Sequence, residues 1–283
     1  WCNTLANYSH PICGDMDVRD VDTDTVFRVL EPIWIEKPET AGRLRGRIES
    51  VLDWATVRGY RTGDNPARWK GHLQALLPAR SKIRRVRHHP ALGYAELSSF
   101  YGELLGRSGT SARALEFTIL TVARSGETTG ATWEEIDLGE RVWTITAERM
   151  KMDRPHTVPL SERAVMILKN LRDSPGANTF VFQGPFGDRL SNMAMLQLLK
   201  RMGRRDITVH GFRSTFRDWA GDCTTYPREV IEQALAHKIG GVEGAYRRSD
   251  ALEKRRRLLT AWADFAAREG SLSGDPVSLS GAS

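Results

Sequence analysis

Residues 208–220, Thr-Val-His-Gly-Phe-Arg-Ser-Thr-Phe-Arg-Asp-Trp-Ala, carry the spacing that decides how this part of the chain folds. Apolar residues recur in it at intervals of three and four, which predicts a helix with one buried side. That side would consist of Val209, Phe212, Phe216 and Trp219. His210 and Arg213 would lie on the neighbouring polar side, within reach of one shared anion. The pair alone is a weak signal, because a His three residues before an Arg is common on protein surfaces.

The segment after residue 220 predicts a second helix that leads to a tyrosine flanked by cations. Pro227 suits a first helical turn, and the helix would end at His237 before a pair of glycines. Its core stripe would consist of Val230, Ile231, Ala234 and Leu235. Tyr246 follows His237 after eight intervening residues, and two arginines follow it directly. Positive charge beside Tyr246 would favour its phenolate form near a phosphate. A tyrosine with only a packing role would fit the same pattern.

Upstream of both helices, Arg124 and Glu127 lie three residues apart at the end of an apolar stretch. A carboxylate at this distance can hold a guanidinium in one orientation, as bidentate phosphate binding requires. The sequence therefore predicts that Glu127 orients Arg124.

The pattern as a whole predicts a mainly α protein with a small antiparallel sheet, which places it in the α+β class. The sheet would come from a hairpin with strands over 142–145 and 157–160. Lys151 lies in the polar loop between these strands and, by itself, is an ordinary loop lysine.

Shifts in composition divide the chain into four parts. The first is a helical domain over 1–79, followed by an exposed basic linker over 80–94. A second domain over 95–268 contains the hairpin and the helices described above. The Ser- and Gly-rich tail, 269–283, is predicted to be disordered.

The first domain contains a helix predicted from an N-cap at Thr40 to a stop at Gly59. Its apolar positions are Leu44, Ile48, Val51, Leu52 and Ala55. Arginines stand among these positions, and by themselves they indicate only a solvated polar face. Together with the linker, the cations of this region are Arg43, Arg45, Arg47, Arg80, Lys82, Arg84, Arg85 and Arg87.

Composition bounds the class of protein. The 283 residues carry a net charge of +6, which is a moderate bias toward polyanions. Three cysteines without ligand spacing are expected to be reduced. We find no signal peptide and no apolar stretch of membrane-span length, so a cytoplasmic location without a membrane partner is expected. The chain opens at Trp1 rather than Met, so a longer natural protein with another N-terminal domain is expected.

Taken in order, the polar residues resemble the signature of the tyrosine recombinase family. The set comprises Arg124 with Glu127, Lys151, His210, Arg213, His237 and Tyr246. Trp-Glu-Glu-Ile-Asp at 133–137, the segment 210–219 and Ala-Tyr-Arg-Arg at 245–248 are similar more narrowly to phage and genomic-island integrases. Segments 37–41, 59–61 and 65–69 are similar to the core-binding domain of that group. The resemblance spans roughly residues 1–266.

The resemblance implies site-specific DNA recombination through a 3′-phosphotyrosyl intermediate, for the integration or excision of a mobile element. Tyr246 would be the nucleophile, while Arg124, Arg213 and His237 would hold the phosphate. Lys151 would protonate the leaving 5′-oxygen, and His210 would act as general base. Neither metal nor cofactor would be required.

The resemblance also implies partners. The substrate would be double-stranded DNA at an attachment-site core, and the arginines of the first domain and the cations of the linker would contact its phosphates. A homo-tetramer would assemble on this DNA, with an excisionase and a host DNA-bending protein as further partners. The apolar stripe of Leu252, Leu258, Leu259, Trp262 and Phe265 would pack on a neighbouring subunit, with packing on its own domain as the close second alternative.

Two features depart from the family pattern. Thr128 and Thr129 stand where an apolar residue is expected, which would loosen the packing beside Arg124. The N-terminal domain that binds arm sites in such integrases is missing from this sequence.

Three alternative functions fit parts of the sequence. A type IB topoisomerase has the same fold and chemistry, and a non-catalytic DNA-binding regulator would keep the fold alone. A metal-dependent nuclease would use the acidic residues Glu134, Glu135 and Asp137, which we interpret instead as a solvated turn.

Overall fold

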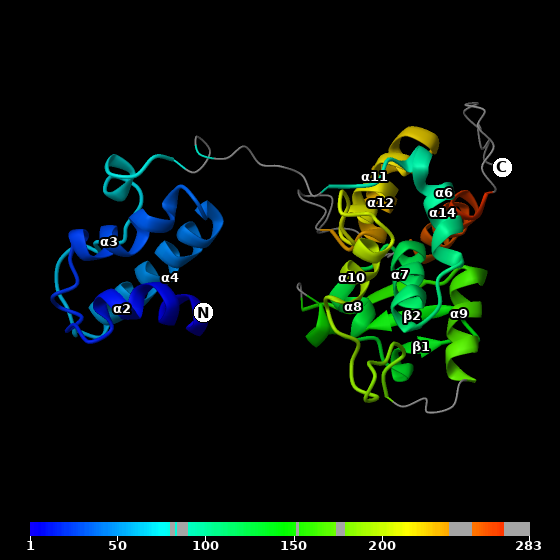
Figure 1. Ribbon diagram of the computed structural model, residues 1–283, viewed down its shortest axis with the longest axis horizontal. Coiled ribbons are helices and arrows are strands. Elements are labelled where there is room, and N and C mark those ends of the chain that lie inside the picture. The colour runs from blue at the N-terminus through cyan, green and yellow to red at the C-terminus, as the bar shows by residue number, and fades with distance from the viewer. Residues whose placement is uncertain (80–82, 84–89, 151–152, 174–178, 238–250, 269–283) are drawn as a thin grey trace. The chain divides into compact units, whose positions relative to one another are not determined.

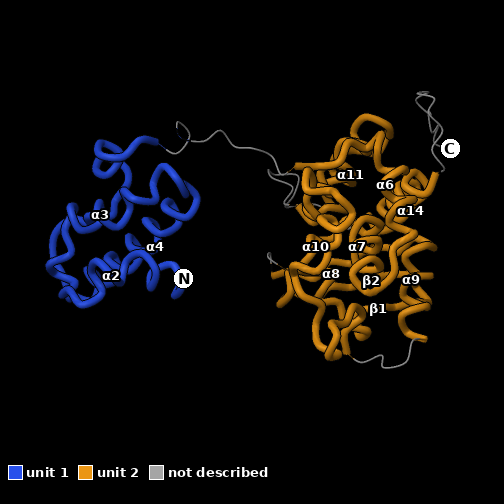
Figure 2. The backbone as a smooth tube through the Cα atoms, viewed as in Figure 1, with its two compact units in different colours: residues 1–88 blue, residues 89–283 orange. Residues whose placement is uncertain are grey.

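The computed structural model describes residues 1–79, 83, 90–150, 153–173, 179–237 and 251–268. It divides the chain into two compact units, residues 1–88 and 89–283 (Figure 2). Several predicted features lie outside the described residues: Lys151, Tyr246, the tail 269–283 and the linker cations Arg80, Lys82, Arg84, Arg85 and Arg87.

The described elements of the first unit are all helical. They are α1 (Cys2–Thr4), a π-helical turn (Leu5–Ser9), α2 (His10–Cys13), α3 (Thr23–Trp34), α4 (Pro38–Val57) and a 3-10 turn (Leu73–Ala75). The longest, α4, buries four of the five expected apolar positions, but Val51 is 44% exposed. The N-cap expected at Thr40 is wrong, because α4 begins two residues earlier at Pro38. The fixed φ of proline suits the first position of a helix.

The second unit gathers helices around one small sheet (Figure 1). Before and within the sheet lie a 3-10 turn (Tyr94–Glu96), α6 (Leu97–Leu105), α7 (Thr110–Thr121), α8 (Ser125–Thr129), 3-10 turns (Trp133–Glu135 and Ala147–Arg149) and strands β1 (Ile136–Asp137), β2 (Val142–Ile145) and β3 (His156–Pro159). After it come α9 (Glu162–Arg172), α10 (Ala194–Arg201), α11 (Gly211–Cys223), α12 (Arg228–Ala234) and α14 (Leu252–Ala267). The expected α+β class is confirmed.

The sheet has the order β1-β2-β3, and both pairings are antiparallel. The predicted hairpin is confirmed, with β3 beginning one residue earlier than expected, at His156. Trp143 pairs with Val158, and Ile145 pairs with His156. Since side chains alternate along a strand, these four residues share the face that is turned toward the core.

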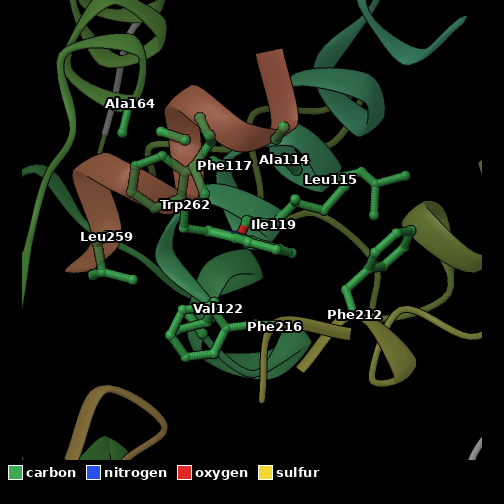
Figure 3. Close-up of a cluster of buried hydrophobic side chains, with 14 of the residues drawn as sticks. Ala114, Leu115, Phe117, Ile119, Val122, Ala164, Phe212, Phe216, Leu259 and Trp262 are labelled. Carbon is green, nitrogen blue, oxygen red and sulfur yellow. The ribbon is translucent and has the colours of Figure 1, made fainter. Parts of the chain in front are cut away.

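Helix α7 is the centre of the core of this unit, and all its residues from 114 to 121 are buried. Phe117, Ile119 and Val122 meet Phe216 of α11 and Trp262 of α14 in one apolar cluster (Figure 3). The buried side predicted for 208–220 is confirmed, but the helix begins at Gly211 rather than at residue 208.

The C-terminal helix α14 packs on its own unit. It contacts α6, α7, α12 and β3, and Leu258, Leu259 and Trp262 are at most 1% exposed. The indole nitrogen of Trp262 donates a hydrogen bond of 2.8 Å to the carbonyl of Ile119 in α7. Of the two alternatives for this stripe, the structure therefore has packing on its own domain.

We expect Trp262→Ala to lower the free energy of unfolding of the second unit by about 3–5 kcal/mol, the usual cost of removing a large buried aromatic ring. Trp262→Phe keeps most of the apolar volume but removes the shorter of the two hydrogen bonds to the Ile119 carbonyl, so a cost of about 1 kcal/mol is expected. Urea unfolding followed by circular dichroism measures both. Equal losses in the two variants would mean that packing of the ring contributes little.

Candidate active site

The first group of the candidate site is Arg124, which caps the short helix α8. Glu127 accepts from the backbone nitrogen of Arg124 at 2.8 Å and from its guanidinium Nη1 at 2.6 Å. The side chain of Glu127 is 7% exposed, and that of Arg124 is 28% exposed. The expected contact between these residues is therefore present, and it leaves the guanidinium oriented and accessible.

The two threonines after Glu127 are well packed, so the expectation of loose packing there is wrong. Thr128 and Thr129 are both 0% exposed. The hydroxyl of Thr118 donates to that of Thr128 at 2.9 Å, and Arg189 donates to the hydroxyl of Thr129 at 3.0 Å. Hydrogen bonds thus satisfy the hydroxyl groups in place of an apolar contact.

The second group is Arg213 of α11. The sequence predicted that it lies on a polar surface, but the structure buries it. Its side chain is 5% exposed, and its two terminal nitrogens donate to the carbonyls of Val122 and Leu235. Val122 ends α7 with φ of 50°, a left-handed conformation that a β-branched residue rarely adopts. Burial lowers the pKa of Arg213 to about 10, and the charge of Arg124 acts in the same direction. An anion between the two guanidinium groups would relieve this repulsion.

The end of α12 brings the two arginines together. Arg213 donates to the carbonyl of Leu235, and Arg124 Nη2 lies 3.3 Å from the carbonyl of the next residue, Ala236. His237 follows, with its Nε2 3.3 Å from Arg213 Nη2 and its side chain 41% exposed. Arg124, Arg213 and His237 therefore converge just after α12.

Four further residues predicted for the site or for DNA binding lie in the described part of the chain. His210 is the N-cap residue of α11 and is exposed, and its carbonyl accepts from the backbone of Arg213. In the first unit, Arg43 is exposed, whereas Arg45 donates to the carbonyl of Ala67 and pairs with Glu49. Arg47 donates to Thr4 and lies over the ring of Trp1.

His156, at the start of β3, is a member of this neighbourhood that sequence reasoning missed. It shares the inward face of the sheet with Ile145. Burial lowers the pKa of His156 to about 4; Arg255, Arg124 and Arg213 act in the same direction, and Glu127 opposes them. The residue is therefore a neutral imidazole at pH 7. The alternation of strand residues after Lys151 is the signal that would have placed it inward.

The depressed pKa of His156 predicts a pH dependence of stability. Because the unfolded residue binds a proton near pH 6.5 and the folded residue only near pH 4, the folded state loses stability as the pH falls through this window. The loss attributable to this residue is at most about 3 kcal/mol. We expect His156→Gln to reduce the change of the free energy of unfolding between pH 6.5 and 4, measured by urea unfolding, relative to the parent. An unchanged slope would contradict the assignment.

Of the three acidic residues interpreted as a solvated turn, Glu134 and Asp137 are exposed, but Glu135 is buried. It accepts from the indole of Trp143 at 3.0 Å and pairs with Arg149. Arg149 also donates to the carbonyl of Glu127, which ties the turn of Arg124 to the base of the hairpin loop. Among the described residues, no cluster of three His, Cys, Asp or Glu side chains is able to hold a metal ion.

This arrangement is suited to binding one tetrahedral anion. Each guanidinium has five N–H donors, and the backbone and carboxylate contacts use only some of them. In the described part of the chain, Nε of Arg213 has no hydrogen-bond acceptor. Two cations and an imidazole that meet at a helix end can stabilise charge that develops on phosphate oxygens.

Solved structures identify the fold. A lambda integrase dimer bound to a COC′ core site superposes with a TM-score of 0.62 at 15% identity, covering 89% of this chain and 88% of that one. A Tn1549 transposon integrase in complex with transposon right end DNA gives 0.63 at 12% identity, covering 90% of each chain. The fold thus falls in the class of the integrases.

Family models and curated relatives agree. The phage integrase family model matches residues 100–253, and the phage integrase central domain model matches residues 1–72. The chain belongs to the phage integrase family, whose members are tyrosine recombinases. It is 34% identical to prophage integrase IntZ and 32% identical to prophage integrase IntA, both of Escherichia coli strain K12. These matches cover 90% and 93% of this chain but only 62% and 63% of the relatives. No helix in the described ranges has the length and apolar character needed to cross a membrane.

Proposed function

We propose that this chain cuts and rejoins DNA at specific sites, through a 3′-phosphotyrosyl intermediate, to integrate or excise a mobile element. The observation that carries the proposal is the convergence of Arg124, Arg213 and His237 at the end of α12. Attack on a phosphodiester builds negative charge on the non-bridging oxygens, so cations must stand beside them. Each preorganised donor of this kind contributes about 2.7–4 kcal/mol to transition-state stabilisation.

In the covalent step we assign one role each to Tyr246, His210 and Lys151. The phenolic oxygen of Tyr246 forms a bond to phosphorus, and the bond from phosphorus to the 5′-oxygen breaks. His210 takes the phenolic proton as general base, and Lys151 gives a proton to the leaving 5′-oxygen. The later attack of another 5′-hydroxyl reverses these steps and reseals the strand. Bond energy is retained in the phosphotyrosine, so the chemistry is balanced without a nucleotide or metal.

We assign the partners from the positive charge of the chain and from its structural similarity to integrases. The substrate is double-stranded DNA: among the fold relatives, a lambda integrase tetramer is bound to a Holliday junction. We place phosphate contacts at Arg43, Arg45 and Arg47 in the core-binding domain 1–79 and along the linker 80–94, with catalysis in 95–268. A homo-tetramer on DNA, an excisionase and a host DNA-bending protein complete the proposed assembly.

The test is the capture of the covalent intermediate. Duplex DNA selected for binding to the chain is nicked near the cleavage point, so that a released fragment diffuses away and the adduct accumulates. We expect a protein–DNA adduct that survives denaturing electrophoresis, forms equally in EDTA, and maps by mass spectrometry to Tyr246. Binding without any adduct would instead indicate a regulator, cleavage that EDTA abolishes would indicate a nuclease, and relaxation of supercoils without strand exchange would indicate a topoisomerase.

A further inference from the structure

Within the proposed function, on which this inference rests, we propose that Glu232 is a positioning residue for His237. It would hold the imidazole with Nδ1 protonated and Nε2 directed at the phosphate site. Glu232 has no place in the sequence signature of the site, and its role follows from contacts at the end of α12.

Glu232 holds His237 at two points. One carboxylate oxygen, Oε2, lies 2.6 Å from His237 Nδ1. The backbone carbonyl of Glu232 accepts from the backbone nitrogen of His237 at 2.9 Å. The Glu232 side chain is 14% exposed, whereas that of His237 is 41% exposed. The ring is therefore held at Nδ1, while part of the side chain stays open to solvent.

Arg217 of α11 keeps the carboxylate of Glu232 charged. Its Nη2 lies 2.9 Å from Oε1, as an ion pair without an aligned hydrogen bond. Burial raises the pKa of Glu232, but the hydrogen bond to His237 and the charge of Arg217 outweigh it, and the net pKa is lowered. A carboxylate without a proton can only accept, so Nδ1 of His237 must be the donor.

The fixed tautomer determines what Nε2 can do. In the neutral ring, Nε2 carries a lone pair and lies 3.3 Å from Arg213 Nη2. Nε2 becomes a donor only when the ring gains a second proton. A carboxylate that orients an imidazole and stabilises its cation is a recurring device of active sites.

The charges around His237 include both signs. The groups that face it or its carboxylate partner are Arg124 before α8, Arg213 and Arg217 of α11, and Arg228 and Glu232 of α12. Glu232 is the one anion in this described set. Its replacement would remove the acceptor that orients Nδ1 of the imidazole.

The first measurement is the tautomer, which does not depend on activity. In protein labelled with ¹⁵N-histidine, long-range proton–nitrogen spectra distinguish an Nδ1–H ring from an Nε2–H ring, and His237→Asn assigns the signal. We expect the parent to show the Nδ1–H tautomer, and Glu232→Gln to admit the Nε2–H form. An Nε2–H ring in the parent would overturn the proposal, even if the chain proves not to cut DNA.

The second measurement is the pH profile of single-turnover cleavage. For Glu232→Gln we expect a loss of about 10–100-fold at pH 8, comparable to the loss of other groups that orient an active-site imidazole. The loss should shrink as the pH falls toward 6, because a ring with protons on both nitrogens has the same donor at Nε2 whether or not the carboxylate is present. Glu229→Gln, the same charge change one turn earlier in α12, should match the parent at every pH. A loss of equal size at all pH values would mean that Glu232 serves folding alone.

Discussion

Tyr246→Phe is expected to abolish the covalent protein–DNA adduct completely, because the ring without its hydroxyl has no nucleophile to offer to phosphorus. Binding of the same DNA should be unchanged within a factor of about two, since phosphate contacts and not the phenol provide the affinity. Denaturing electrophoresis measures the adduct, and a gel-shift titration at fixed salt concentration measures binding.

Tyr226→Phe is the matched control. Tyr226 precedes α12, packs partly against the core of the second unit, and has no role in the proposed chemistry. This variant should form the adduct at the parental rate. An adduct that persists in Tyr246→Phe would mean that another residue is the nucleophile and that the assignment of Tyr246 is wrong.

Arg213→Lys is expected to slow single-turnover cleavage by about 10²–10³-fold while DNA binding changes little. The substitution keeps the charge but not the planar fork, which in the structure reaches the carbonyls of Val122 and Leu235 at once. The single ammonium group of a lysine cannot reach both carbonyls and the phosphate at the same time. The thermal midpoint should also fall, because a buried carbonyl loses its donor.

A conservative arginine-to-lysine change at the surface is the control for both the cleavage rate and the thermal midpoint. Arg201→Lys at the exposed end of α10 should alter neither the cleavage rate nor the thermal midpoint. If Arg213→Lys lowers the midpoint but cleaves at the parental rate below it, Arg213 is structural and the phosphate site must be sought elsewhere.

Local patterns were sufficient for much of the fold. The hairpin was predictable because turn residues separate two β-prone segments, and the buried side of α11 followed from its apolar spacing. The contact of Arg124 with Glu127 was equally predictable, since three residues at a helix start bring the two side chains together.

Interactions between distant segments were the part that the sequence could not reveal. Arg213 lies on the side of α11 that an amphipathic pattern assigns to solvent, yet it is buried. Its burial depends on carbonyls that two other helices offer at their ends, and one of them requires the left-handed Val122. Glu135 is similar, because Trp143 and Arg149 receive its carboxylate. No local spacing encodes such partners.

Because Arg213 and Arg124 contact the carbonyls of Leu235 and Ala236 just after α12, the backbone that leads to His237 is held in place. Nine peptide steps separate His237 from Tyr246, and a fully extended chain spans at most about 30 Å over that distance. If Tyr246 is the nucleophile, as proposed, its hydroxyl reaches only phosphates that lie within this backbone span of His237 plus the length of the tyrosine side chain.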